Sequence, residues 1–290
     1  MELGQVGVWF FTDTQSAEDA ATFAQRIESL GYAALWIPEA VGRHPFAHAA
    51  WLLAKTSRLV VATGIASIYN RDPGATVAAA NTLAEQSNNR FILGLGVSHQ
   101  PMVEGVRGHA YGKPVTTMRT YLESMDKAIY RAIMPSSPAP IVLAALGPNM
   151  LALAGTAAGG AHPYFTTPAH TRKAREIMGA GPLLCVEQKV ILNSDPGVAR
   201  AAARGAAGMY AQLPNYRNNW LRLGFSEEDI NGLSDAFIDA TFAWGDTAQI
   251  RARIDEHLAA GASHVCIQPI APSNPGFPDM AALEALAPAG

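Results

Sequence analysis

The sequence predicts an α/β fold, a (β/α)8 TIM barrel, in which residues 1–290 form one domain. Strand-like and helix-like segments alternate at a spacing of roughly 30 to 35 residues, which is typical of βα units. The strand-like segments are continuous runs of Val, Ile, Leu and Phe, so both faces of each strand should be buried, as in a parallel sheet covered by helices. Because no linker rich in Pro, Gly and Ser divides the chain, one barrel of about 250 residues accounts for it better than two domains.

Eight strands can be placed, each in alternation with a helical pattern. A doubly wound sheet is the alternative arrangement, but it requires a glycine-rich phosphate loop after the first strand, and VWFFTDTQSAED contains no glycine. The predicted strands are residues 5–11, 33–39, 59–66, 90–98, 140–146, 161–166, 183–193 and 264–270.

Capping residues mark several of the helix boundaries. Ser16 with Asp19, and Asp246 with Gln249, have the spacing of a capping box, in which each side chain satisfies a free backbone N–H. A long helix is predicted after the fourth strand, and a further helix is predicted over residues 235–244. The apolar stripe of the long helix consists of Met118, Tyr121, Leu122, Met125, Ile129 and Ile133.

The composition limits the classes of partner. The 21 basic and 24 acidic residues are spread along the chain and give a net charge of −3, so no cationic stripe is available for nucleic acid. Cys185 and Cys266 lie in apolar runs, where a reduced, buried thiol is expected. The first residues form a strand pattern rather than a signal peptide, and no apolar stretch reaches the roughly 18 residues that cross a bilayer. We therefore expect a cytoplasmic protein without nucleic-acid or membrane partners.

The residues that follow the strands are the first candidates for function, because these loops carry the active site in barrels of this type. Aromatic and amide groups predominate there and charged groups are few, which is typical of a site for a flat, mostly apolar ring. The candidates are Trp9, Phe10, Phe11, Glu39, residues 64–67, residues 96–99, residues 147–149 and Gln268.

Glycines after or before strands suggest a phosphate-bearing ligand. Gly96 lies in GLGVS, and Gly159 and Gly160 lie in AAGGAH. Backbone N–H groups without side chains can approach phosphate oxygens closely. Glycine at such turns is also a common helix C-cap, so a structural role for Gly159 and Gly160 is the alternative.

Six runs of sequence, in this order and spacing, resemble the bacterial luciferase-like flavin and deazaflavin enzymes, and in particular their coenzyme F420-dependent oxidoreductase branch. The resemblance extends from the first through the eighth predicted strand. Its most specific parts are the segment that ends at Arg71 and Pro73 and the run RFILGLG. The runs are GVWFF, LWIPEA, VVATGIASIYNRDP, RFILGLGVSH, AALGPNMLALAGTAAGG and GDTAQIRARIDEHLAAGASHV.

The resemblance implies a luciferase-like barrel, usually a homodimer, that binds F420 and transfers a hydride between the deazaflavin C5 and a small organic substrate. It implies a non-prolyl cis peptide between Gly64 and Ile65, beneath the ring, and a cofactor phosphate on the N–H groups of Gly159 and Gly160. With the positions after the strands, it gives as expected cofactor-binding residues Trp9, Glu39, Gly64, Ile65, Ala66, Gly96, Val97, Ser98, Gly147, Asn149, Gly159 and Gly160.

The chain departs from the deazaflavin sugar-phosphate dehydrogenases at two positions. Those relatives place a His after the acid of the second strand and a Glu after the fourth-strand loop, where this chain has Ala40 and His99. A sugar phosphate is therefore a doubtful substrate. Glu39 and His99 are the expected catalytic residues, with His99 as a proton donor because imidazole titrates near neutral pH.

Two further functions are compatible with the same sequence features. A reduced-FMN monooxygenase with a separate reductase, and a flavin or deazaflavin carrier without turnover, are the alternatives. His44 and His48 are spaced i and i+4, but they lack the HExxH carboxylate, so no metal is expected. Arg71 and Asp72 are expected to pair with each other. Four further histidines are expected on the surface or at helix caps: His109, His170, His257 and His264.

Overall fold

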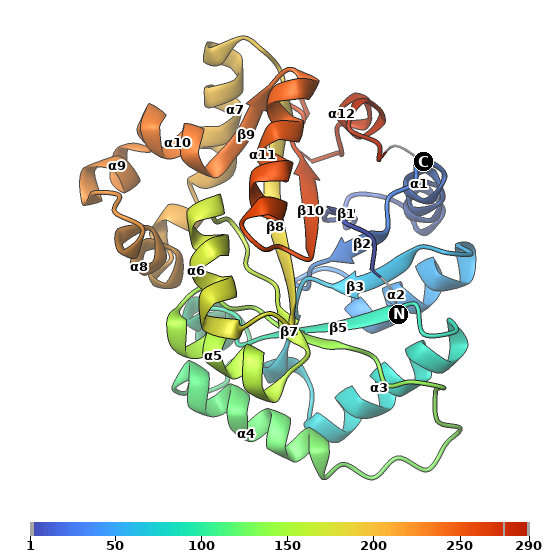
Figure 1. The fold of residues 1–290 in the computed structure, drawn as a ribbon. Coiled ribbons are helices and arrows are strands. Elements are labelled where there is room, and N and C mark those ends of the chain that lie inside the picture. Colours follow the sequence, from blue (N-terminus) through green and yellow to red (C-terminus); the bar gives the residue numbers. More distant parts are fainter. Residues whose placement is uncertain (1–2, 275, 289–290) are drawn as a thin grey trace.

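A closed sheet of parallel strands forms the centre of the structure (Figure 1). The computed structural model describes residues 3–274 and 276–288. In this part of the chain eight strands make the barrel, and β10 closes it by pairing with both β1 and β8. The TIM barrel prediction is therefore confirmed. The barrel strands are β1 Val6–Trp9, β2 Ala34–Ile37, β3 Val60–Thr63, β5 Phe91–Gly96, β6 Ile141–Leu143, β7 Gly160–Ala161, β8 Leu183–Leu192 and β10 His264–Pro269.

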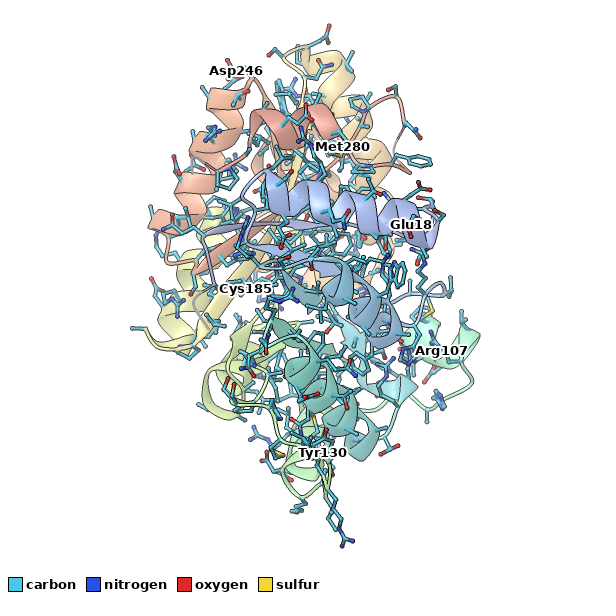
Figure 2. All side chains as sticks on the ribbon, turned by 90° about the vertical axis from the view of Figure 1, so that its right-hand side faces the viewer. Glu18, Arg107, Tyr130, Cys185, Asp246 and Met280 are labelled. Atoms are coloured by element: carbon cyan, nitrogen blue, oxygen red, sulfur yellow. The ribbon has the colours of Figure 1, made fainter. Side chains whose placement is uncertain are left out.

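Helices surround the barrel and return the chain from the end of one strand to the start of the next (Figure 1). Figure 2 shows α1, α2 and α3 side by side on one face, with Glu18 of α1 and Arg107 at the same end of the molecule. The helices around the barrel are α1 Ala17–Ser29, α2 Pro45–Lys55, α3 Pro73–Gln86, α4 Pro114–Asp126, α5 Pro148–Ala157, α6 Pro168–Met178 and α11 Thr247–Ala259.

The remaining elements are short strands and helices outside this repeat. Strand β4 continues the β3 wall by pairing with β5, and β9 pairs with the second half of β8. These elements are β4 Ala66–Ser67, β9 Phe242–Gly245, α7 Pro196–Ala207, α8 Pro214–Arg222, α9 Glu227–Gly232, α10 Asp235–Thr241, α12 Met280–Ala285, the 3-10 turns η1 Ile68–Asn70 and η3 Tyr210–Gln212, and the π-turn η2 Pro101–Val106.

The helix caps agree with the sequence pattern in detail at one position and in part at another. Asp246 and Gln249 form the reciprocal capping box expected for α11. At α1, the Ser16 hydroxyl accepts the Asp19 N–H, but the Asp19 carboxylate accepts the Ser16 hydroxyl at 2.6 Å instead of a backbone N–H. Side chains therefore satisfy N–H groups that the first helical turn leaves free.

Two predicted helices end earlier than expected. The helix over 235–244 stops at Thr241, and Phe242–Gly245 form β9, because these residues pair with Lys189–Leu192 of β8. The long helix α4 stops at Asp126, and Ile129 and Ile133 beyond it are 80% and 76% exposed. Tertiary pairing decided the first case. In the second, the apolar spacing continued past the end of the helix by chance.

Three of the histidines expected on the surface or at caps are in fact buried, so that prediction was wrong for them. His170 Nε2 contacts the Leu146 carbonyl at 2.9 Å, and His264 Nδ1 contacts the Gly4 carbonyl at 2.6 Å. His257 contacts both the Thr171 hydroxyl and the Gln188 side chain. These hydrogen bonds offset the cost of burying the imidazoles. Their partners are distant in the sequence, so the pattern of apolar residues does not reveal them.

Cys185 and Cys266 are free and buried, as predicted. Of the predicted histidine pair, His44 is the N-cap of α2 and His48 lies inside it, bonded to the Thr12 hydroxyl at 2.7 Å. Across residues 3–274 and 276–288, no cluster of three His, Cys, Asp or Glu side chains could hold a metal ion. No helix in the same residues is both long and apolar enough to cross a membrane.

Candidate active site

A cavity of about 560 Å³ opens at the carboxyl ends of the barrel strands, where the sequence predicted the functional loops to lie. Its volume is in the range of small-molecule sites, and aromatic rings contribute much of its wall. The expected site residues that line it are Trp9, Glu39, Gly64, Ile65, Val97, Ser98, His99, Gly147 and Asn149.

The peptide between Gly64 and Ile65 is cis, as the family resemblance implied. The Trp9 indole N–H donates to the Gly64 carbonyl at 2.9 Å. A Cβ on Gly64 would lie 2.8 Å from Trp9 Nε1 and 3.1 Å from His162 Nε2, so a larger residue does not fit between these rings. Glycine at this position therefore keeps the cavity open beside Gly64.

Ala66 and Gly96 lie behind the cavity wall rather than on it. Ala66 pairs with Leu95 in the β4–β5 ladder. A Cβ on Gly96 would contact the Ile65 side chain at 2.5 Å. Both small residues thus support the Gly64–Ile65 segment from behind.

The Glu39 carboxylate is held by the protein itself. It accepts the Ser67 N–H at 2.7 Å and the Arg71 Nη1–H at 3.0 Å, and it forms a second, short contact with Arg71 Nη2. The side chains of Glu39 and Arg71 are 6% and 8% exposed. Arg71 therefore pairs with Glu39, not with Asp72 as predicted, because Asp72 is the N-cap of α3. This pair ties the end of β2 to the β4 segment.

His99 lies on the cavity wall beside Tyr216, with a ring-to-ring distance of 5.8 Å. Burial lowers the pKa of His99, while a hydrogen bond with the Asn215 side chain acts in the opposite direction. The imidazole is therefore mostly neutral near pH 7. A neutral imidazole accepts a proton more readily than it donates one, which reverses the role expected from the sequence.

Gly159 and Gly160 are not at the cavity. They lie at the start of β7, the opposite end of the barrel from the mouth, and the Gly159 N–H donates to the Ile141 carbonyl at 2.8 Å. A Cβ on Gly160 would collide with the Leu183 backbone. The prediction that they bind a phosphate at the mouth does not agree with this position, and close strand packing explains both glycines.

The N-terminus of α5 offers an anion site at the cavity instead. Gly147 is its N-cap, and no side chain caps the first turn. The N–H groups of Asn149 and Met150 belong to this turn and point outward from the helix end. The Arg222 guanidinium lies beside Gly147: its Nη2 is 3.5 Å from the position that a Cβ on Gly147 would take. Backbone N–H groups, a helix dipole and a cation thus meet on one wall.

Sequence reasoning missed the cavity residues that follow β8. The sequence predicts no helix over residues 213–226, but these residues contain α8, which places Asn215, Tyr216, Asn218 and Arg222 on the cavity. The concentration of Asn and aromatic residues after a strand's carboxyl end was the available signal. Trp244, by contrast, is not on the cavity wall, and its indole N–H donates to Asp239.

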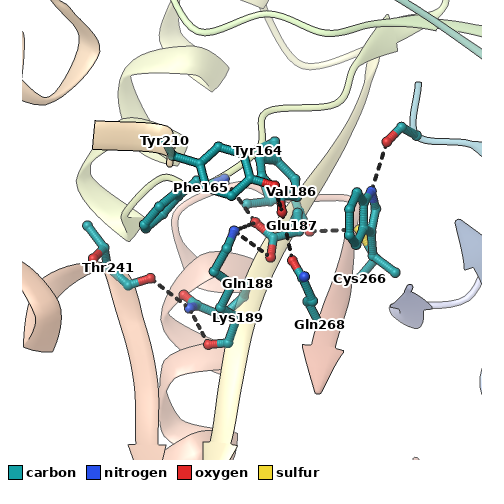
Figure 3. Close-up of polar contacts among 12 residues, drawn as sticks. Tyr164, Phe165, Val186, Glu187, Gln188, Lys189, Tyr210, Thr241, Cys266 and Gln268 are labelled. Atoms are coloured by element: carbon teal, nitrogen blue, oxygen red, sulfur yellow. Dashed lines mark hydrogen bonds and ion pairs between the residues drawn. The ribbon is translucent and has the colours of Figure 1, made fainter. Parts of the chain in front are cut away.

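A buried ion pair lies behind the aromatic wall (Figure 3). Lys189 Nζ is 3.1 Å from Glu187 Oε2 and 3.7 Å from the centre of the Tyr164 ring. The Tyr164 hydroxyl donates to the Gln268 side-chain oxygen and contacts the Tyr210 hydroxyl, each at 2.9 Å. Burial lowers the pKa of Lys189 to about 8 and raises the pKa of Glu187. The pair and the hydrogen bonds fix the tyrosines that face the cavity.

Residues 2–264 match the model of the luciferase-like monooxygenase family. The chain belongs to this family. It is a luciferase-like oxidoreductase, and it is 25% identical to a Mycobacterium tuberculosis protein provisionally named a coenzyme F420-dependent oxidoreductase, over 92% of this chain and 94% of the relative.

Solved structures share the luciferase-like fold of this enzyme. One is an F420-dependent secondary alcohol dehydrogenase in complex with an F420–acetone adduct, with a TM-score of 0.76 and 14% identity over 98% of this chain and 97% of that chain. Another is the oxygenating constituent of 3,6-diketocamphane monooxygenase from Pseudomonas putida in complex with FMN, with a TM-score of 0.70 and 14% identity over 98% and 96%. At such identities the likeness shows the fold alone.

Proposed function

We propose that this luciferase-like enzyme is a coenzyme F420-dependent oxidoreductase that exchanges a hydride between the deazaflavin C5 and a small organic substrate. The observation that carries the proposal is the cavity of about 560 Å³, with Trp9, Tyr164 and Tyr216 in its wall and with Gly64 between the Trp9 and His162 rings. An apolar, aromatic cavity with a few fixed polar groups suits a planar ring system. The M. tuberculosis relative supports F420 over FMN. A homodimer remains a prediction of the family resemblance, and a cytoplasmic location remains a prediction of the sequence pattern.

The polar groups of the cavity also suit the rest of such a cofactor. A phosphate tail would find the free N–H groups of the α5 N-terminus and the Arg222 guanidinium on the same wall. Val97 and Ser98, which directly follow β5, line the same cavity. The expected phosphate site thus moves from Gly159 and Gly160 to α5.

The bound deazaflavin would supply hydride exchange at its C5. His99 would take the proton from the substrate hydroxyl as the carbon that bears this hydroxyl is oxidised, since the neutral imidazole has a lone pair that can accept it. Asn215 orients the imidazole, and Tyr216 covers it. Glu39 does not move protons in this proposal, because Arg71 and Ser67 occupy its oxygens.

Titration with cofactors tests the proposed function. We expect quenching or enhancement of F420 fluorescence with a micromolar-range dissociation constant, and at least tenfold weaker binding of FMN. The phosphate-free deazaflavin riboside should bind more weakly than F420, because it leaves the α5 site empty. Tighter binding of FMN together with oxygen uptake would replace F420 by the reduced-FMN monooxygenase. Binding without turnover of any alcohol or ketone would favour the carrier.

The pH dependence of turnover tests His99. Because burial lowers the pKa of His99 below the ordinary imidazole value of about 6.5, kcat/KM for alcohol oxidation should be flat at neutral pH and should fall only at more acidic pH, where the buried imidazole takes up a proton. Replacing His99 with glutamine should lower kcat by roughly 10² to 10⁴ and abolish this acidic limb, with F420 affinity changed little. An unchanged kcat and pH profile in His99→Gln would exclude His99 as the proton acceptor.

A further inference from the structure

His162 presents a hydrogen-bond acceptor to the cavity that no protein group uses. The residue directly follows β7, is 1% exposed and lines the cavity. Its Nδ1 lies 2.8 Å from the Cys185 carbonyl. A carbonyl oxygen only accepts hydrogen bonds, so Nδ1 carries the proton. Burial lowers the pKa of His162 to about 4, and the ring is therefore neutral with its lone pair on Nε2.

The surroundings fix the direction of this lone pair. The imidazole stacks on Trp36, with centroids 4.4 Å apart and planes 12° apart, and the Trp36 indole N–H donates to His264. The backbone N–H of His162 donates to the Leu143 carbonyl at 2.8 Å. Nε2 lies on the Gly64 side of the ring, 3.1 Å from the position that a Cβ on Gly64 would take. Backbone, ring face and Nδ1 are thus all held, which leaves the ring little freedom to turn.

No donor in the described part of the chain satisfies Nε2. The nearest indole N–H, that of Trp9, donates to the Gly64 carbonyl. The Tyr164 hydroxyl donates to Gln268. An acceptor that is buried without a donor loses its hydration without compensation, so a donor from outside the protein should bind there with a favourable contribution.

We propose that His162 determines specificity by accepting a hydrogen bond from a ring N–H of the bound ligand. The proposal names a contact within the proposed function and rests on it. The pyrimidine-dione part of an oxidised deazaflavin or flavin carries a single N–H, at N3, and its other polar ring atoms are acceptors. Within that part of the ring, N3–H is therefore the group that can donate to the neutral imidazole nitrogen. The ligand class is therefore a planar heterocycle with an imide N–H.

Methylation of the ligand tests this contact. We would measure the dissociation constants of the oxidised deazaflavin riboside and its N3-methyl derivative by fluorescence, for the wild type and for His162→Leu. The wild type should bind the N3-methyl compound roughly tenfold or more weakly. His162→Leu should bind both compounds with nearly equal affinity, because it removes the acceptor. His162→Gln, which can still accept, should keep part of the preference.

His99→Leu is the matched control, since it removes the other imidazole of the cavity and should change both affinities alike. Thermal unfolding of every variant checks that it is folded, and the wild-type ratio tests the proposal even where His162→Leu does not fold. Equal affinities in the wild type, or an unchanged ratio in His162→Leu, would overturn the role of His162 while leaving the proposed function intact. Failure of the wild type to bind F420, FMN and the riboside would overturn both.

Discussion

Replacing Glu39 with alanine is expected to lower the free energy of unfolding by about 3 to 5 kcal/mol, because it leaves a buried guanidinium without its partner. Arg71 would lose both contacts with the carboxylate, and the Ser67 N–H would lose its acceptor. Arg71 also packs over the Phe46 ring at 4.8 Å, where water cannot easily replace the lost bonds. Urea unfolding at pH 7.5, with the midpoint and slope fitted together, measures the change.

A double-mutant cycle separates the ion pair from general damage. Arg71→Met alone should also destabilise the protein strongly, whereas Glu39→Ala combined with Arg71→Met should be less harmful than the sum of the two changes. Asp72→Ala is the matched control, because it removes only an N-cap and should cost about 1 kcal/mol. A loss below about 1 kcal/mol in Glu39→Ala, together with a large drop in kcat, would return Glu39 to the catalytic residues predicted from the sequence.

Acid is expected to unfold this enzyme steeply, near pH 5. Burial lowers the pKa of His162, His170 and His264 to about 4 and that of His257 to about 3. In the unfolded chain these imidazoles take up protons below a pKa of about 6.5, so unfolding is coupled to proton uptake. Their contribution to stability is fully present above pH 6.5 and decreases as the pH falls toward 4.

The size of the effect follows from the width of this pH window. Each histidine lowers the free energy of unfolding by about 2 kcal/mol between neutral pH and pH 5. The four together lower it by about 8 kcal/mol, which is comparable to the whole free energy of unfolding of an ordinary protein. The raised pKa of Glu187 acts in the opposite sense and offsets a part of this loss.

Urea unfolding at several pH values between 7.5 and 5 measures the number of protons that the chain takes up when it unfolds. The slope of the unfolding free energy against pH should approach three to four protons, estimated as about 1.4 kcal/mol per pH unit for each. His257→Gln is the matched variant, since glutamine can still contact Thr171 or Gln188 and should reduce the slope by about one proton. A stability that stays constant from pH 7 to pH 5 would show that these histidines are not buried in the neutral form.

The sequence predicted the barrel strands well because burial on both faces leaves a direct trace in composition. Runs such as Val60–Thr63 and Phe91–Gly96 read as continuous apolar segments, and the structure places both in the barrel. Strand β9 left no such trace. Its four residues follow α10 without a break, and only their pairing with β8 determines that they are a strand.

The site was predictable where function depends on position after a strand. Trp9, Gly64 and His99 follow or end strands and line the cavity, as expected. Arg71, His162 and Arg222 were not identified in their structural roles, because these depend on contacts between residues distant in sequence: Arg71 on Glu39, His162 on Cys185, and Arg222 on the start of α5. Hydrogen-bond partners of this kind are a property of the folded chain.

The helices between β8 and β9 pack around a group of apolar side chains that includes Trp220 and Phe237, and Phe165, which follows β7, belongs to the same group. The segment between β8 and β9 contributes Tyr210, Tyr216 and Arg222 to one side of the cavity, while β1 to β5 form the opposite side. The substrate preference of such a barrel can therefore change through one segment of the chain. A library of variants confined to residues 208–221 would vary the side of the cavity that holds Tyr210 and Tyr216, while Arg222 and the half that holds Gly64, Ile65 and Glu39 are left untouched.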